Sequence, residues 1–269
     1  MISRRHLVVG AASCLLPQRA RADVDPSWRP RNLDVREVHV DGALSRSFVL
    51  GVPTHLAVGE RVPLLVLLHG LGETGDERTG AWAWFERYGL GTSYDRLRAH
   101  GAMRGLVLAC PYMPNLSAGQ PGRLDEYARW LVDPVVTRVR LEAPAIDVPA
   151  STYLCGCSLG GHFSLEVMLR RADFFGAWGG VQTAIDEPAG QRYGRKLAEA
   201  IAQSGPRPLL VETSSGDPFR AGNVALSTTL SKGGVAHSFV DLPGPHDQGW
   251  LRGSGTERML SWFDALGAR

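Results

Sequence analysis

One serine of this chain lies between glycines at a spacing that suits a nucleophile. Gly156, Ser158 and Gly160 form the pattern G-x-S-x-G, between an apolar run and an amphipathic segment at 163–171. The pattern is typical of a strained turn from a strand into a helix, with the serine hydroxyl exposed at its tip. Glycines suit such a turn because side chains there would clash with neighbouring backbone. The pattern also arises by chance, but its position at a strand–helix junction favours a catalytic serine.

The groups that would activate this serine follow two later apolar segments. A serine hydroxyl needs a base to accept its proton, and the base needs an acid to orient it. With this kind of turn the order along the chain is serine, acid, histidine. Asp217 follows a predicted strand that ends at Thr213, and His246 follows one that ends at Leu242. We therefore predict Ser158 as the nucleophile, Asp217 as the acid and His246 as the base.

Other acids and histidines fit these roles less well. Asp186 follows a strand, but one strand too early, and Asp247 is adjacent to the proposed base. His162 follows the serine on its helix, where packing or capping is the simpler interpretation. The alternative for Asp217 is an ordinary turn aspartate before a proline. Four other histidines precede the core strands, end a helix or open a strand: His39, His55, His100 and His237.

Two backbone N–H groups could stabilise the negative oxygen that forms when the serine attacks a carbonyl. One belongs to Leu159, directly after the serine. The other is expected from Leu71, in the turn 69–72 that follows the apolar run 63–68. A His–Gly pair at a strand end can also be a tight turn with no further role. Its position after a central strand favours Leu71 as the second donor.

A connection rich in glycine and tryptophan, at 71–92, follows this turn. We predict that Trp82, Trp84 and Tyr88 shape a pocket for the acyl or alcohol part of a substrate. The alternative is an aromatic cluster packed beneath a long loop. The segment 184–192 is too short for a large lid domain, so we expect a fairly open site.

The first 22 residues have the features of a secretion signal. Arg4 and Arg5 precede an apolar stretch, Leu7 to Leu16, which is too short to span a bilayer. Small residues at Ala20–Arg21–Ala22 predict cleavage before residue 23. The paired arginines fit twin-arginine export as well as general secretion. We expect an exported protein, periplasmic or secreted, and leave the route open.

Composition favours one globular domain over residues 23–269. The chain has 269 residues, of which 44% are hydrophobic and 21% charged, in the range of an ordinary single α/β unit. Its net charge is +2, and residues 1–22 hold four arginines and no acid, so the remainder carries −2. A near-neutral chain gives no electrostatic argument for binding nucleic acid. No segment beyond residue 22 is apolar enough to span a membrane.

Three cysteines remain after removal of the signal. Cys155 and Cys157 lie two apart on one predicted strand, on the same face but in poor geometry for a mutual bridge. Cys110 ends a different strand. An odd number argues against a disulfide framework, so buried free thiols are favoured over a bridge or a metal-binding pair.

Strands alternate with helices along most of the chain, which predicts βαβ units and a mostly parallel sheet. An antiparallel hairpin is expected at 35–52, with Asp41–Gly42 between its strands. Pro134 should kink or divide one helix, and Ser254 with Glu257 should form a capping box at the start of the last. The predicted strands are 63–68, 105–110, 151–157, 176–184, 208–213 and 236–242, and the helices are 94–100, 124–141, 163–171, 192–204, 223–231 and 254–267.

These motifs together resemble the α/β-hydrolase superfamily, and within it the esterase group of esterase D, S-formylglutathione hydrolases and antigen 85 mycolyltransferases. The segment 156–162 resembles that group's G-x-S-M-G-G-H/Y turn, with Leu159 in place of methionine. The segments 68–71 and 245–250 resemble its oxyanion turn and its His–Asp segment. The resemblance implies a three-layer α/β-hydrolase fold without a large lid, and a strand between those of Cys110 and Cys155. Glutathione- and mycolate-specific features are not recognisable, so the substrate is not carried over.

The sequence thus predicts a serine carboxylic-ester hydrolase that works through an acyl-enzyme, without a metal or organic cofactor. Its substrate would be a small-molecule or polymer-borne ester. Alternatives with the same three residues are an acyltransferase and a peptidase. An alternative of another class is a non-catalytic binding protein on a hydrolase scaffold. Acyl and alcohol specificity and oligomeric state are not predicted.

Overall fold

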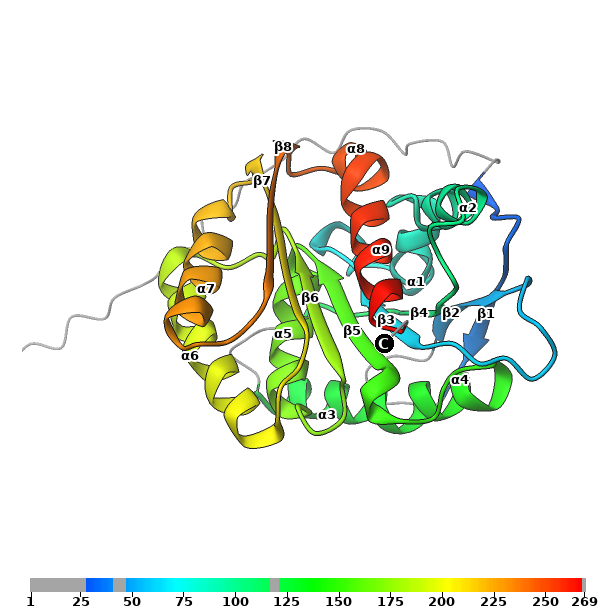
Figure 1. The fold of residues 1–269 in the computed structure, drawn as a ribbon, viewed down its shortest axis with the longest axis horizontal. Helices are drawn as coiled ribbons and strands as arrows, with labels where there is room; N and C mark the ends of the chain where they lie inside the picture. The colour runs from blue at the N-terminus through cyan, green and yellow to red at the C-terminus, as the bar shows by residue number, and fades with distance from the viewer. Residues whose placement is uncertain (1–27, 41–46, 117–120, 268–269) are drawn as a thin grey trace, which may run out of the picture.

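The computed structural model describes residues 28–40, 47–116 and 121–267 of the chain. The predicted signal (1–22) and the hairpin turn at Asp41–Gly42 lie outside the described residues. The described chain forms an eight-stranded sheet in the order β1-β2-β4-β3-β5-β6-β7-β8 (Figure 1). The strands are β1 Leu33–His39, β2 Ser47–Pro53, β3 Leu64–Leu68, β4 Val107–Pro111, β5 Thr152–Cys157, β6 Ala177–Val181, β7 Leu209–Gly216 and β8 Ser238–Pro245.

The sheet is antiparallel at one edge and parallel in the rest, as the sequence predicts. β1 pairs with β2, and β2 with β4, in antiparallel register, and the other strands pair in parallel. β3 and β5 are buried along their whole length, which explains their uninterrupted apolar sequences. From β3 the chain passes to β4 on one side and then to β5 on the other. Ligands of open α/β sheets bind beyond the carboxyl ends of the strands at such a reversal.

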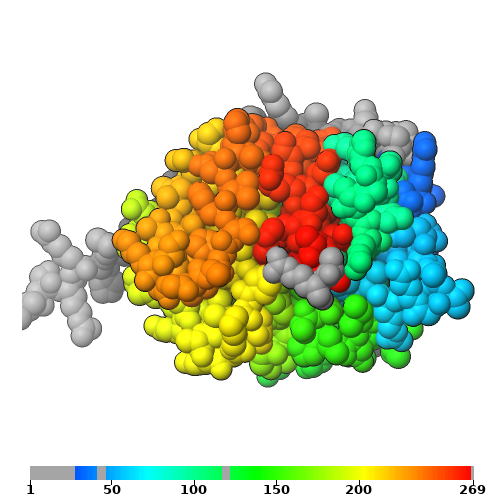
Figure 2. Space-filling view, in the orientation of Figure 1, coloured from blue at the N-terminus to red at the C-terminus, as the bar shows by residue number. Residues whose placement is uncertain are grey.

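Helices cover both faces of this sheet, which gives the predicted three layers. One face carries α1 (Glu77–Glu86), α2 (Leu90–Ala99) and α9 (Thr256–Leu266). Figure 2 shows α9, in red, beside α2, in green, on this side of the molecule. The other face carries α3 (Pro121–Trp130), η3 (Leu131–Val136), α4 (Thr137–Glu142), α5 (Leu159–Arg170), α6 (Glu187–Ser204) and α7 (Arg220–Lys232).

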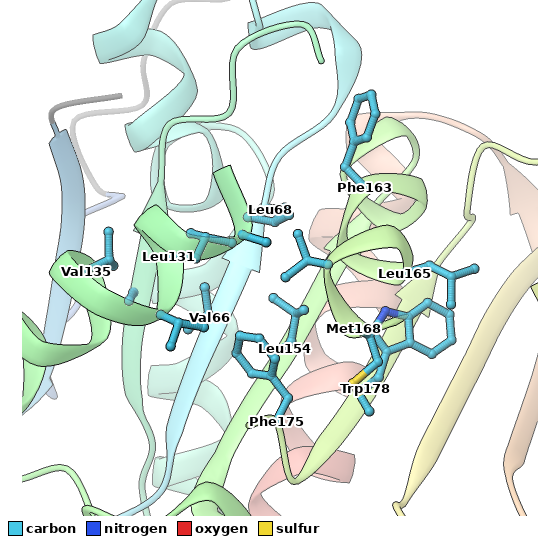
Figure 3. Packing of buried hydrophobic residues seen from close by; sticks show 14 of the residues in the cluster. Val66, Leu68, Leu131, Val135, Leu154, Phe163, Leu165, Met168, Phe175 and Trp178 are labelled. Carbon is cyan, nitrogen blue, oxygen red and sulfur yellow. The ribbon is translucent and has the colours of Figure 1, made fainter. Parts of the chain in front are cut away.

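Each face has its own hydrophobic core. On the α5 side, Val66 and Leu154 of the sheet lie between Leu131 of η3 and Met168 of α5 (Figure 3). On the α9 side, large aromatic side chains from three helices are buried, including Trp84, Tyr94 and Phe263. Full burial of one such side chain stabilises the fold by about 1.5–3 kcal/mol. The two cores fix the sheet against its helices and so fix the positions of the strand ends.

The connection predicted as a loop at 71–92 is instead largely helical. It contains a short helix, η2 (Leu71–Glu73), the whole of α1 and the start of α2. Asp76 begins α1, because its carboxylate accepts the Thr79 N–H at 2.7 Å. The glycines and acids that suggest a loop therefore include a helix cap. Burial of the α1 aromatic residues in the core overrides the low helix propensity of glycine.

Other helix boundaries also differ from the prediction. The last helical segment begins at α8 (Gln248–Trp250), where the Asp247 carboxylate accepts the Trp250 N–H at 2.8 Å. It continues through the π-helical turn η5 (Leu251–Gly255) into α9, so Ser254 lies inside the segment and is not its cap. Asp186 caps α6 in the same way as Asp247 caps α8. Pro134 divides its helix as predicted, at the π-helical turn η3.

The cysteines are free and buried, as predicted. Cys110, Cys155 and Cys157 form no disulfide in the part of the chain that the structure describes. β3 lies between β4 and β5, which separates Cys110 from the other two. None of the helices in the described ranges has the length and apolar character needed to cross a bilayer.

One buried acid lies against the α9 face of β7. The Glu212 side chain is fully buried, and neither of its carboxyl oxygens has a hydrogen-bond partner among the described residues. Burial raises the pKa of Glu212 from 4.5 to about 8, while Arg258 on α9 lowers it only in part. Buried Cys155 is a further neighbour, and the same desolvation raises its pKa. Glu212 is therefore held as the neutral acid at neutral pH.

We predict that Glu212 makes the protein less stable as the pH rises. Between pH 4.5 and about 8 the folded state keeps a proton that the unfolded chain loses, so the free energy of unfolding falls over this interval. Glu212→Gln should remove that part of the decline. Urea unfolding at pH 5 and pH 8 measures it, with Glu199→Gln on the exposed side of α6 as the control. Equal pH dependence in wild type and Glu212→Gln would contradict the prediction.

Candidate functional site

Ser158 lies on a strained turn between β5 and α5. Its backbone has φ 53° and ψ −119°, a combination that side chains disfavour. Two hydrogen bonds hold this conformation: the Ser158 N–H donates to Val181 O at 2.9 Å, and the Ala184 N–H donates to Ser158 O at 2.9 Å. The strain predicted from the glycine pattern is thus present, and the loop after β6 supports it.

Glycines at this turn are required by close contact between backbone segments. A Cβ at Gly160 would lie 2.3 Å from Leu68 O and 2.4 Å from His69 O. A Cβ at Gly156 would lie 2.3 Å from Gly160 O. Only glycine therefore lets the start of α5 rest on the end of β3, which sets Ser158 beside the turn that follows β3.

The structure brings the three predicted residues into one chain of hydrogen bonds. His246 Nε2 lies 3.0 Å from Ser158 Oγ, and His246 Nδ1 lies 2.8 Å from Asp217 Oδ1. Because a carboxylate only accepts, Nδ1 carries the ring proton and Nε2 can accept the serine proton. The Phe219 ring packs edge-on against the imidazole, with 5.5 Å between the ring centroids. This geometry is that of a base placed between a nucleophile and an orienting acid.

The Asp217 carboxylate is buried and fully satisfied. Thr213 Oγ1 donates to Asp217 Oδ2 at 2.7 Å, and the Phe219 N–H donates to Asp217 Oδ1 at 2.9 Å. The His246 ring supplies the third hydrogen bond. A buried charge is tolerated only when it is paired and hydrogen-bonded. These contacts hold the carboxylate on the Nδ1 side of the ring.

The two predicted oxyanion donors belong to residues that each begin a helical segment. Leu159 begins α5, and Leu71 begins η2, the turn that follows β3. The nearest approach of that turn to the serine is at Gly70, where a Cβ would lie 3.9 Å from the Ser158 Cβ. Within the described ranges, neither the Leu71 nor the Leu159 N–H has a protein acceptor. Both N–H groups are therefore available to an acceptor from outside the described chain.

His69 fixes the turn on one side, a role that the sequence analysis misses. The Met113 N–H donates to His69 Nε2 at 2.9 Å, so the ring proton is on Nδ1 and donates to Gly70 O at 2.9 Å. Burial lowers the pKa of His69 to about 4, which keeps the ring neutral. The Tyr112 ring stacks on it. The signal in the sequence is the His–Gly pair, which predicts the turn of Leu71 but not the role of the imidazole.

Tyr88 fixes the same turn on the other side and is not an open pocket wall. Its hydroxyl accepts the Gly70 N–H at 3.2 Å and donates to Glu73 Oε2 at 2.6 Å. Glu73 also binds Arg87 at 3.2 Å and Gln248 at 3.4 Å. Tyr88 is 3% exposed, so its effect on the site is to hold the turn in place.

The two tryptophans predicted for the pocket also pack elsewhere. Trp84 is fully buried and contacts Tyr88 edge-on. Trp82 is partly buried, packs against Trp28 and donates its Nε1–H to Glu37 at 2.9 Å. Trp84 and Tyr88 thus contact each other in the core, as in the alternative of a packed cluster, whereas Trp82 packs separately and the segment over them is helical. Trp84 lies on the buried side of α1, and Trp82, two residues earlier, points away from it.

The competing residues have structural partners. His162 Nε2 lies 2.8 Å from the Tyr193 hydroxyl, and its ring stacks on Phe163. Asp186 and Asp247 cap helices. The described residues include no group of three His, Cys, Asp or Glu side chains that could hold a metal ion. None of these residues replaces Asp217 or His246 at the serine.

Comparison with known proteins identifies the fold. Neither the protein-family models nor the curated proteins gave a match to this sequence. Among solved structures, a ferulic acid esterase aligns with TM-score 0.72 and 18% identity, over 87% of this chain and 99% of that chain. The feruloyl esterase module from Clostridium thermocellum aligns with TM-score 0.69 and 16% identity, over 89% of each chain. S-formylglutathione hydrolase from Staphylococcus aureus aligns with TM-score 0.64 and 14% identity, over 86% and 98%. The chain therefore has the α/β-hydrolase fold.

We predict that Gly160→Ala destabilises the protein by about 1–3 kcal/mol, because the new methyl group would overlap backbone oxygens that cannot move independently. Chemical denaturation measures the change. Gly253→Ala is the matched control, since Gly253 also lies in a helical segment but has no atom within 4 Å of the added Cβ. Equal stability of the two variants would show that the contact between α5 and β3 is not tight.

Proposed function

We propose that this chain is an exported serine carboxylic-ester hydrolase that works through an acyl-enzyme intermediate. The observation that carries the proposal is the chain of hydrogen bonds from Ser158 through His246 to Asp217. The α/β-hydrolase fold supports it, since esterases occur among the structures with this fold that align with the chain. Export rests on the sequence of residues 1–22 alone.

In the proposed first half-reaction, Ser158 Oγ attacks the ester carbonyl carbon while His246 Nε2 takes the hydroxyl proton. Asp217 stabilises the imidazolium that forms, and the N–H groups of Leu71 and Leu159 donate to the carbonyl oxygen as it becomes negative. His246 then gives its proton to the leaving alkoxide. The alcohol departs and leaves Ser158 acylated.

In the second half-reaction, water attacks the acyl carbon and His246 accepts its proton. Collapse of the second tetrahedral intermediate releases the carboxylic acid, and the proton returns from His246 to Ser158 Oγ. No step needs a group beyond these residues and water. The proposal names an ester of a carboxylic acid as the substrate class. Feruloyl esters enter the test because feruloyl esterases share the fold.

We predict that the protein hydrolyses at least one ester of a panel and that Ser158→Ala abolishes this turnover. The panel comprises p-nitrophenyl esters from acetate to palmitate, together with aryl and feruloyl esters. Turnover is measured as release of the alcohol or phenol. Ser254→Ala, an exposed serine of η5, is the control and should keep the wild-type rate. Absence of turnover on every ester, or turnover that survives in Ser158→Ala, would contradict the proposal. Added alcohol or amine acceptors measure transfer against hydrolysis in the same assay.

We predict that Asp217→Asn lowers kcat by about 10⁴-fold, because an amide that donates to Nδ1 would place the ring proton on the wrong nitrogen. The variant keeps the shape of the side chain, so its melting temperature serves to separate catalysis from folding. Asp186→Asn is the matched control, since asparagine also caps a helix and α6 should persist. A near-normal kcat for Asp217→Asn would assign the acid to another residue.

A further inference from the structure

Gln182 has an unusual backbone conformation directly after β6. Its φ is 47°, and among the described residues Ser158 is the other non-glycine residue with positive φ. Gln182 is 2% exposed. A left-handed backbone at a residue other than glycine, asparagine or aspartate costs free energy and persists where its surroundings determine it. The contacts of the side chain show what determines it here.

The Gln182 side chain joins the ends of three neighbouring strands. Its amide nitrogen donates to Ser214 Oγ at 2.7 Å and to Pro245 O at 2.9 Å, while the Ser214 hydroxyl donates to Pro245 O at 3.2 Å. The Gln182 backbone N–H donates to Glu212 O at 2.6 Å. β6, β7 and β8 lie side by side in the sheet (Figure 1). The side chain that follows β6 therefore contacts the ends of both β7 and β8.

The groups that Gln182 contacts are next in sequence, or hydrogen-bonded, to residues of the proposed chemistry. Pro245 precedes His246, and the Ser214 carbonyl accepts the Asp217 N–H at 3.1 Å. The residue before Gln182 is Val181, whose carbonyl accepts the Ser158 N–H. The segment 181–182 is thus bonded at once to the nucleophile, to the turn of the acid and to the residue before the base.

Backbone pairing alone does not fix the register at this place. The ladder between β7 and β8 is irregular between Ser214 and Gly216, where the pairing shifts by a residue. Pro245 has no N–H, so the backbone of the residue directly before His246 can be held only through its carbonyl. Where the regular ladder is interrupted, the Gln182 amide donates to this carbonyl directly, and it also donates to the Ser214 hydroxyl, which is the second donor to the carbonyl.

We propose that Gln182 is a positioning residue that aligns His246 with Ser158 by holding the Pro245 carbonyl. This role rests on the serine-hydrolase function proposed above. Gln182 does not touch the reacting atoms and acts through the base. A displacement of about 1 Å in such a group can reduce the rate by about 10²-fold. Loss of the amide should therefore lower kcat, while substrate binding is unaffected.

Two substitutions test this role. Gln182→Gly removes the amide and relieves the positive φ, and Gln182→Asn tolerates the φ but has a side chain one methylene too short to reach both acceptors. We expect kcat to fall by about 10- to 100-fold in each, with KM within about twofold of wild type. Asp264→Ala is the control. Buried Asp264 accepts the Arg104 and Gly105 N–H groups just before the start of β4, at the ends of the strands opposite to those that carry the site. It should lower the melting temperature and keep kcat.

A double-mutant cycle shows whether Gln182 acts through His246. In His246→Ala, Gln182→Gly should cause no further loss of the residual ester turnover, because the group it positions is absent. A further loss of 10-fold or more would overturn the proposal, as would near-normal kcat in both Gln182 variants. In either case an active wild type leaves the hydrolase function standing. A wild type inactive on every ester would overturn the proposed function and this role together.

Discussion

The contact between the start of α5 and the end of β3 constrains the whole site. Gly160 lets the start of α5 meet the end of β3, and Gly156 lets β5 approach Gly160; an added Cβ at either position would overlap a backbone oxygen. The contact forces Ser158 into a strained conformation and sets it beside the turn that holds the Leu71 N–H. The strain is stable because hydrogen bonds from the last residue of β6 and from the loop after it hold the serine backbone on both sides.

The acid and the base of the site lie in loops that follow two other strands of the sheet. Asp217 and His246 come from loops after β7 and β8, and the parallel register brings both loops to the edge where β5 ends. Buried polar groups then keep the loops in place. Thr213 binds the acid, His69 and Tyr88 bind the turn after β3, and Gln182 binds the chain before the base. The bonds between Gln182 and Pro245, between Met113 and His69 and between His246 and Ser158 join segments far apart in the sequence.

That distance explains what the sequence predicts and what it does not. The strands, the nucleophile turn and the order of the three residues are local patterns of apolar runs, glycines and turn residues. The tautomer of His69, the positive φ of Gln182 and the burial of Glu212 depend on partners in other strands, so no local pattern indicates them. The segment 71–92 was misinterpreted for a related reason. Its glycines suggest a loop, but burial of Trp84 against the sheet stabilises a helix.

The central claim is that Ser158 is a nucleophile activated by the residues around it. The most direct measurement is the reaction of the intact protein with a fluorophosphonate, followed by digestion and peptide mass mapping. The account predicts one adduct per chain, on the peptide that contains Ser158, formed much more slowly in His246→Ala. No adduct on the wild-type protein, or an adduct on another residue, would contradict it.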